Sequence, residues 1–319
     1  WRPETEREGV LQRLGIDQVK NKLEETGRFP IGRGSRKNSI AKQQEEETSE
    51  TPAIFVVTQL ALTPSQVECY ACAKGMETPQ EFIAALEMNN AWAFATRPLD
   101  VEFLYAYWNN EGHLGNLTDL SEYMILKLLT EVPNREKQDA LTLEKAREGA
   151  EFLAAAVIFC RRLKFRVSNV SDIAGENLLS PVDVLPEDWL AKERHALMDR
   201  ALFDAASRGA MSFHHRHLSD YLAAAWIARL MNNSQCGMES LEGLLFSTVN
   251  GRRVMRSSRK PVAVWLITEG TEPWRARLAE WILESCPEIH LAHGDPAALP
   301  LEYRRRVLSK LIERYQGRN

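Results

Sequence analysis

From residue 63 onward, nearly every segment of the chain spaces its apolar residues as an amphipathic helix does, and prolines and glycines separate these segments. The clearest case begins at residue 142. Its apolar positions are Ala146, Ala150, Leu153, Ala154, Val157 and Ile158. Because residues three, four and seven apart share one side of a helix, this spacing predicts a buried helical face. The sequence therefore predicts a mainly α fold.

Helix-start signals recur through residues 63–133. Thr63 or Ser65 can cap a first helix, Thr78 precedes a proline at the first helical position of a second, and Pro98 lies in the first turn of a third. A fourth opens at Thr118 and ends before Pro133. Short connections between such helices predict a helical domain, a compact bundle of hairpins, over residues 63–133.

The only strongly β-like segment lies before this bundle. Ile54, Phe55, Val56 and Val57 are consecutive and apolar, as in a strand buried on both faces of a parallel sheet. The preceding residues 27–52 are polar and predict a flexible loop. A strand of this kind needs neighbours, and the chain begins with Trp1 rather than Met. We therefore expect residues 1–62 to be the tail end of an α/β domain that lies mostly upstream.

Residues 134–234 alternate helices with short strands. The long helix from residue 142 leads into a strand at 165–167, a helix follows at 192–209, and a second strand at 210–213 precedes another helix. This order predicts a winged-helix-like domain. Residues 235–319 contain further helical segments, including 237–249, with breaks at Pro261, Pro273, Pro287 and Pro300. They predict the start of an α-helical repeat array, a possible sensor segment.

Composition adds few constraints on partners. The net charge is −4 and no apolar run approaches the roughly 20 residues that span a bilayer. The N-terminus is charged from Arg2, so we expect no signal peptide, no membrane partner and a cytoplasmic location. Cys69 and Cys72 form a C-x-x-C, but no second pair completes a zinc site. We expect two buried thiols in a reducing compartment rather than a redox motif.

Three of the seven histidines lie together at positions 214, 215 and 217, just before a helix. Metal binding is disfavoured, because these positions are too close to converge from one helix face and no nearby Cys, Asp or Glu has metal-site spacing. A structural role, with half-buried rings at the helix start, is one alternative. The other is an anion sensor, because a helix N-terminus presents free N–H groups and a positive dipole end.

The sequence around the cluster, FHHRHLSDYLAAAW, resembles the winged-helix motif of NACHT-type STAND NTPases. That motif reads Phe-x-His-x-x-aromatic/aliphatic-x-Glu-Tyr/Phe-x-Ala-Ala. The matching positions are Phe213, His215, Leu218, Tyr221, Ala223 and Ala224. Asp220 stands where Glu is usual, which keeps the charge. The resemblance implies that His215 contacts the β-phosphate of bound ADP and holds a closed resting state; it implies no role for His214 or His217.

Two further segments are similar to the same family. Residues 62–104 resemble its helical domain, and within them Arg97, Pro98 and Leu99 match the turn whose proline packs on adenine. Residues 284–308 are similar to helical segments of large bacterial members, including antiphage (AVAST-like) proteins. The resemblance makes residues 1–62 the end of the NTPase core and assigns Arg97, Pro98 and His215 as nucleotide-binding residues.

The same resemblance sets the expected cofactors and partners. The chain lacks a Walker A loop and a convincing Walker B strand, so we do not expect it to hydrolyse ATP by itself. A full-length parent would bind ADP or ATP with Mg, whereas no nucleotide is expected to bind tightly to this segment alone. The implied partners are an upstream P-loop domain, a protein or nucleic-acid trigger at the downstream repeats, and further copies of the protein when it is active.

The alternative is a non-enzymatic helical scaffold whose winged helix binds protein or DNA. Two basic clusters support it. They comprise Arg252, Arg253, Arg256, Arg259 and Lys260, and Arg304 to Arg306. Such clusters can track a phosphate backbone, but they are more often solvated faces, and the chain as a whole is acidic.

Overall fold

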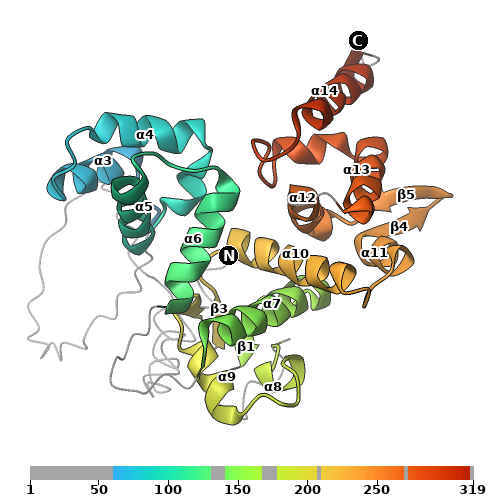
Figure 1. The fold of residues 1–319 in the computed structure, drawn as a ribbon, viewed down its shortest axis with the longest axis horizontal. Coiled ribbons are helices and arrows are strands. Elements are labelled where there is room, and N and C mark those ends of the chain that lie inside the picture. The colour runs from blue at the N-terminus through green and yellow to red at the C-terminus, as the bar shows by residue number, and fades with distance from the viewer. Residues whose placement is uncertain (1–59, 131–140, 167–177, 207–209, 269–271, 317–319) are drawn as a thin grey trace, which may run out of the picture. The chain divides into compact units, whose positions relative to one another are not determined.

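The structure is a computed structural model, and it describes residues 60–130, 141–166, 178–206, 210–268 and 272–316. From Ala61 the chain forms one compact unit, which is mainly helical as the sequence predicted (Figure 1). The predicted strand at 54–57 and loop at 27–52 lie outside the described residues. No described helix has the length and apolar character to cross a bilayer. The domain boundaries proposed within the unit stay predictions.

The first part of the unit is a group of short helices. They are α3 (Pro64–Ala73), α4 (Pro79–Met88), α5 (Pro98–Glu111) and α6 (Leu117–Thr130), with the 3-10 turn η1 (Ala91–Phe94) between α4 and α5. Thr63 caps α3 through a reciprocal pair of hydrogen bonds. Its hydroxyl accepts from the Gln66 amide at 3.3 Å, and the Gln66 side chain accepts from the Thr63 amide at 2.9 Å.

The prediction that Cys69 and Cys72 are buried is wrong. Both thiols are free and exposed on α3. The buried side of this helix is formed by Val67 and Ala71, four residues apart, and the cysteines lie on other sides of the helix. The three-residue spacing of the cysteines predicted that both lie on one face of α3, but it did not predict whether that face packs against the core.

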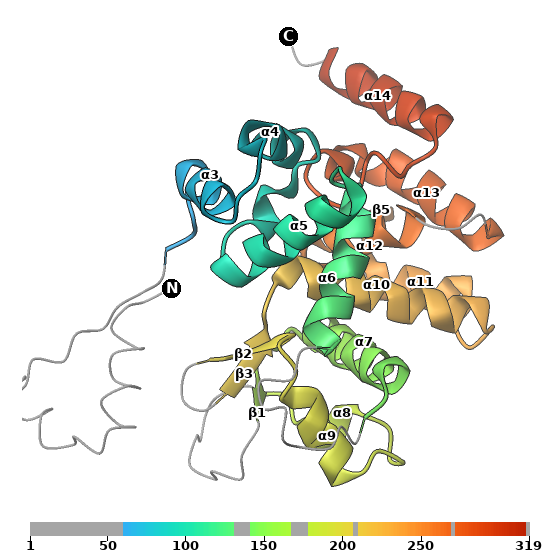
Figure 2. The ribbon, with the colours of Figure 1, turned by 60° about the vertical axis from the view of Figure 1, so that its left-hand side comes forward.

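The middle part combines helices with a small antiparallel sheet. Its elements are α7 (Leu143–Cys160), β1 (Phe165–Arg166), α8 (Pro181–Val184), α9 (Ala191–Met198), β2 (Phe203–Ala205), β3 (Ala210–Phe213) and α10 (Arg216–Asn232). The strand order is β1-β3-β2, with β3 in the centre (Figure 2). The two strands predicted at 165–167 and 210–213 correspond to β1 and β3 and are therefore confirmed within the described residues. The winged-helix assignment stays a prediction.

The helix predicted over residues 192–209 is wrong in its second half. It ends at Met198, and Phe203 instead pairs with Phe213 across the β2–β3 ladder. The rings of Phe165, Phe203 and Phe213 pack together, with centroids 4.9 to 5.8 Å apart. Packing of these three aromatic rings, two of them buried, outweighs the modest helix propensity of this segment.

The last part of the unit contains helices and a β-hairpin. Its elements are α11 (Met238–Leu245), β4 (Phe246–Val249), β5 (Arg252–Met255), η3 (Ser257–Arg259), α12 (Lys260–Thr268), α13 (Pro273–Ser285), η4 (Pro287–Leu291) and α14 (Leu301–Gln316). The helix predicted over 237–249 is thus too long. Asn250 and Gly251 both have positive φ, as a two-residue hairpin turn requires, and this Asn-Gly pair was the sequence signal for the hairpin.

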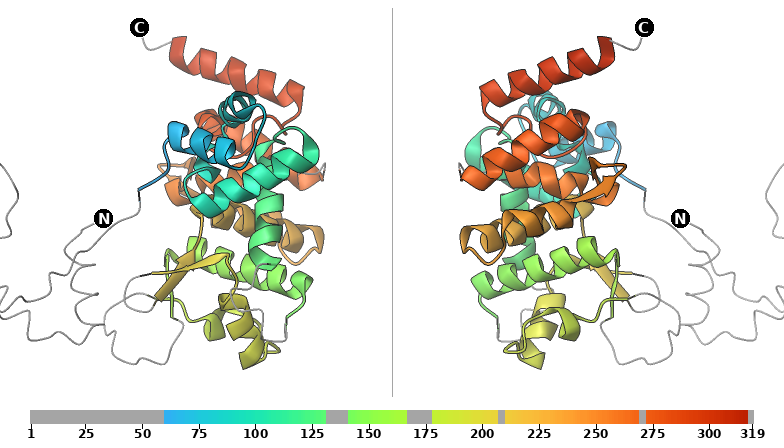
Figure 3. Two further views of the ribbon diagram at one scale, coloured as in Figure 1. Left: turned by 90° about the vertical axis from the view of Figure 1, so that its left-hand side faces the viewer. Right: turned by 90° about the vertical axis from the view of Figure 1, so that its right-hand side faces the viewer.

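Successive helices pack as layers, with α10 at the centre. α7 contacts α9 on one side and α10 on the other, and α10 continues through α12 and α13 to α14 (Figure 3). All six predicted apolar positions of α7 are buried. The first half of α10, from Leu218 to Ala224, is buried all round, because α7 and α12 cover two of its sides.

Gly149 allows close packing of α7 against the loop before α9. A Cβ at this position would lie 2.4 Å from the Trp189 ring and 2.7 Å from a methyl group of Leu197. We expect Gly149→Ala to lower the free energy of unfolding by about 2 kcal/mol, because buried rings must shift. Gly243→Ala on α11, where a Cβ meets nothing within 4 Å, is the control and should gain about 0.5 kcal/mol. Urea denaturation followed by circular dichroism measures both; equal effects would contradict this packing.

Candidate functional site at the N-termini of α5 and α10

The three residues predicted to bind nucleotide lie at the starts of two helices that meet in space. Arg97 is the N-cap of α5, Pro98 is its first residue, and His215 is the N-cap of α10. Asp100, in the first turn of α5, joins them, because its Oδ2 lies 2.9 Å from His215 Nε2. Two segments more than one hundred residues apart in the chain are thereby in direct contact.

His214 forms the centre of this contact. Its Nε2 is 2.8 Å from Oδ1 of Asp100, and its Nδ1 is 3.0 Å from both carboxylate oxygens of Asp204 on β2. The Arg97 guanidinium pairs with Asp204 and lies 2.8 Å from His214 Nδ1. We call Arg97, Asp100, Asp204, His214 and His215 the α5–α10 cluster.

Most of the α5–α10 cluster is buried. The exposed fractions are 0% for Asp100, 7% for His214 and 8% for His215. Asp100 Oδ2 and His215 Nε2 are 2.9 Å apart, but neither atom makes an aligned hydrogen bond to any residue that the structure describes. These two buried polar atoms are therefore held only by their mutual electrostatic contact, which compensates their burial less well than aligned hydrogen bonds would.

The ionisation of the α5–α10 cluster follows from its contacts. Burial alone would lower the pKa of His214, but hydrogen bonds to Asp100 and Asp204 raise it to about 9. Burial would raise the pKa of both carboxyls, and the histidine contacts outweigh it and lower them. At neutral pH the cluster thus holds an imidazolium between two carboxylates.

These contacts decide how far the site fits the nucleotide that the resemblance implies. Pro98 is exposed beside Leu99, so the start of α5 offers an apolar surface of the kind that packs on a purine. His215 Nε2 lies 2.9 Å from the Asp100 carboxylate and so faces the protein in this structure, and its assignment as a phosphate contact stays a prediction. In this conformation His215 is occupied by the protein itself.

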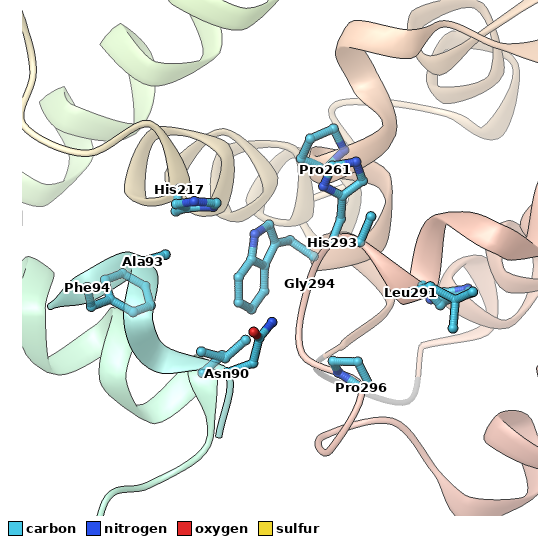
Figure 4. Close-up of a pocket in the computed structure, with 13 residues that line it drawn as sticks. Asn90, Ala93, Phe94, His217, Pro261, Leu291, His293, Gly294 and Pro296 are labelled. Carbon is cyan, nitrogen blue, oxygen red and sulfur yellow. The ribbon is translucent and has the colours of Figure 1, made fainter. Parts of the chain in front are cut away.

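His217 lies outside the α5–α10 cluster and lines a small pocket instead (Figure 4). The pocket also contains Asn90, Phe94, His290 and His293, and its volume is about 80 Å³. Burial lowers the pKa of all three histidines, that of His290 to about 4, so their imidazoles are neutral at pH 7. Pockets that hold drug-sized ligands have roughly 300–1,000 Å³, so this one is too small for a nucleotide.

Several arginines of the predicted basic clusters make contacts within the protein. Arg253 pairs with Glu242 and stacks on the Trp281 ring at 4.5 Å. Arg259 is buried against the Phe159 ring at 4.4 Å, and Arg306 forms a double hydrogen bond with Glu280. No observation on these residues favours a DNA-binding surface.

The sequence missed the residues that complete the site. Asp100, Asp204 and His214 carried no predicted role. The sequence shows no nearby Cys, Asp or Glu at metal-site spacing, but the fold brings Asp100 within 2.9 Å of both His214 and His215. Asp100 is 114 positions from His214 and Asp204 is 10, so no local spacing relates the three. The available signals were weak: an acidic residue in the first turn of a helix, and one in a segment that was taken for helix but forms β2.

No protein-family model matches the chain, and no curated protein matches it significantly.

Proposed function

We propose that this chain is the regulatory part of a STAND-type signalling ATPase, in which the α5–α10 cluster holds the resting conformation closed. The observation that carries the proposal is the buried contact of Asp100 on α5 with both His214 and His215 ahead of α10. It joins the segment that resembles the helical domain to the segment that resembles the winged-helix motif.

A buried ionic contact has the properties that a two-state switch needs. When both partners are present the charges compensate each other, and removing one partner leaves the other buried and uncompensated at a cost of about 3–5 kcal/mol. Asp100 and the two histidines are therefore stable either in direct contact or fully separated and hydrated. Intermediate separations are unfavourable, because the charges would be neither paired nor hydrated. Such bistable interfaces convert a small bias into a change of conformation.

The remaining parts of the proposal concern partners. An upstream P-loop domain would bind ADP or ATP with Mg, and a trigger would bind the helices that follow residue 235. The trigger must bind the open state more tightly than the closed state, since a ligand with equal affinity for both shifts nothing. The open state would then assemble into a homo-oligomer, and the antiphage resemblance favours a role in defence.

The test is the rate of ADP release from the full-length protein. We expect His215→Ala to release ADP at least tenfold faster, because a destabilised closed state is linked to weaker nucleotide retention. His195→Ala is the matched control, since its side chain is 61% exposed on α9 and pairs with the exposed Asp199. Equal release by both variants, or a protein that binds no nucleotide, would contradict the proposal.

A further inference from the structure

We propose that Asp100, His214 and His215 form a binding site for a divalent transition-metal ion of the zinc class. Each of the three side chains offers one ligand atom, and these atoms lie within 4.8 Å of one another. The site is independent of the nucleotide argument, because it rests only on side chains that the structure places together.

The donor set is one that zinc uses in proteins. Two imidazole nitrogens and one carboxylate oxygen leave a fourth position for water in a tetrahedral site. All three side chains are more than nine-tenths buried. His215 Nε2 and Asp100 Oδ2 are buried atoms that lack an aligned hydrogen bond to any described residue, and they lie 2.9 Å apart. A cation between them would satisfy both.

The distances require little rearrangement. His214 Nε2 and His215 Nε2 lie 2.8 and 2.9 Å from the two oxygens of Asp100. Ligand atoms around tetrahedral zinc, with bonds of about 2.0–2.1 Å, are about 3.4 Å apart. To admit the ion, the two nitrogen–oxygen distances would lengthen by roughly half an ångström, while the two histidine nitrogens already lie within 4.8 Å of each other. The ion would take the place of the proton between His214 and Asp100.

Asp204 supplies the outer support that metal-binding histidines usually have. Its carboxylate lies 3.0 Å from Nδ1 of His214, so it can accept a hydrogen bond from Nδ1–H and favour the tautomer in which Nε2 has a free lone pair. Arg97 pairs with Asp204 and holds that carboxylate in place. The arrangement is a carboxylate–histidine–metal triad in which Asp204 positions the ligand without touching the ion.

A metal at this position would bridge α5 to the residues that precede α10. If the proposed function is correct, the ion would stabilise the closed α5–α10 cluster; the site itself does not depend on that role. Metal binding can be measured without any nucleotide, so its failure and the failure of the switch proposal are separate results.

The experiment is a titration of the chain with Co²⁺, followed by visible absorption. It uses a parent carrying Cys69→Ser and Cys72→Ser, because the exposed thiols could bind cobalt on their own. We expect an absorption band that saturates at one equivalent and is displaced by Zn²⁺. His214→Ala and His215→Gln should each weaken Co²⁺ binding at least tenfold, and Asp204→Asn by about 10–100-fold.

His293→Ala is the matched control, because this histidine lines the neighbouring pocket and should leave Co²⁺ affinity unchanged. Circular dichroism confirms that each variant is folded. In parallel, Zn²⁺ should raise the thermal midpoint of the parent but not that of His215→Gln. A parent with no band and no midpoint shift would overturn the proposal, and so would a band that survives unchanged in folded His214→Ala and His215→Gln.

Discussion

Asp295→Ala is expected to lower the free energy of unfolding by about 4 kcal/mol, because it removes a buried carboxylate that accepts four hydrogen bonds. Asp295 is 1% exposed, and its Oδ2 accepts from the amide and the hydroxyl of Thr118, at 2.9 and 3.0 Å. Its Oδ1 accepts from the amides of Ala297 and Ala298. The side chain thus caps α6 from a position 177 residues further along the chain.

The cost arises mainly at Thr118, because that residue is buried and alanine would leave both of its donors without a partner. Asp295→Asn keeps one acceptor oxygen and should lose about half as much. Asp188→Ala, at an exposed carboxylate, is the control and should change little. Urea denaturation followed by circular dichroism measures all three. A loss below 1 kcal/mol for Asp295→Ala would show that this contact does not hold η4 and its following loop to α6.

The second large effect is a pH dependence that Asp220 imposes on stability. Asp220 is 3% exposed in the buried half of α10, and its Oδ1 accepts no hydrogen bond from any residue in the described part of the chain. Burial raises the pKa of this carboxyl to about 7, and the charge of Arg216 opposes the shift only in part. Between pH 3.8 and about 7, the Asp220 carboxyl is therefore protonated in the folded state but ionised in the unfolded chain, where its pKa has the ordinary value of 3.8.

Below pH 3.8 both states are protonated and Asp220 costs nothing. As the pH rises from there to about 7, stability falls, and above 7 the loss is constant. Because one pKa unit corresponds to 1.36 kcal/mol, the loss between pH 5 and pH 8 is about 3 kcal/mol.

Asp220→Asn removes this titration, so its stability relative to the parent should rise by about 3 kcal/mol between pH 5 and pH 8. The comparison between the two proteins cancels every other titrating group. Asp188→Asn makes the same charge change at an exposed site and should show no such pH-dependent difference. If the two variants behave alike in urea denaturation at both pH values, Asp220 is not the buried acid that the structure describes.

Apolar spacing and helix-capping residues correctly predicted those helices whose formation depends on residues close together in the chain. The apolar face of α7 and the Thr63 cap of α3 depend on residues within a few positions of each other, and both are confirmed. These signals failed where a distant partner decides. β2 forms because Phe203 meets Phe213 and Phe165, and local spacing gave no hint of which side of α3 would carry Cys69. The β4–β5 hairpin is a different kind of error, because the Asn250–Gly251 pair is a local turn signal that a helix prediction over 237–249 overlooked.

For the site, the sequence singled out the starts of two helices but not the network of contacts that joins them. Arg97 and His215 were assigned from a motif, and the structure brings their two helix starts together. The carboxylates that surround His214 could not be predicted, because Asp100 and Asp204 reach it from a different helix and from a strand. Buried charge networks depend on tertiary proximity, which a single sequence does not record.

The claim that nucleotide state controls the α5–α10 cluster can be tested most directly by hydrogen exchange at two amides. The Val101 amide donates to the carbonyl of Arg97, and the Ser219 amide donates to that of His215, so each reports the first turn of one of the two helices. In the full-length protein, both amides should exchange at least tenfold faster with a non-hydrolysable ATP analogue than with ADP, as the cluster opens. Equal exchange in the two nucleotide states would contradict the account.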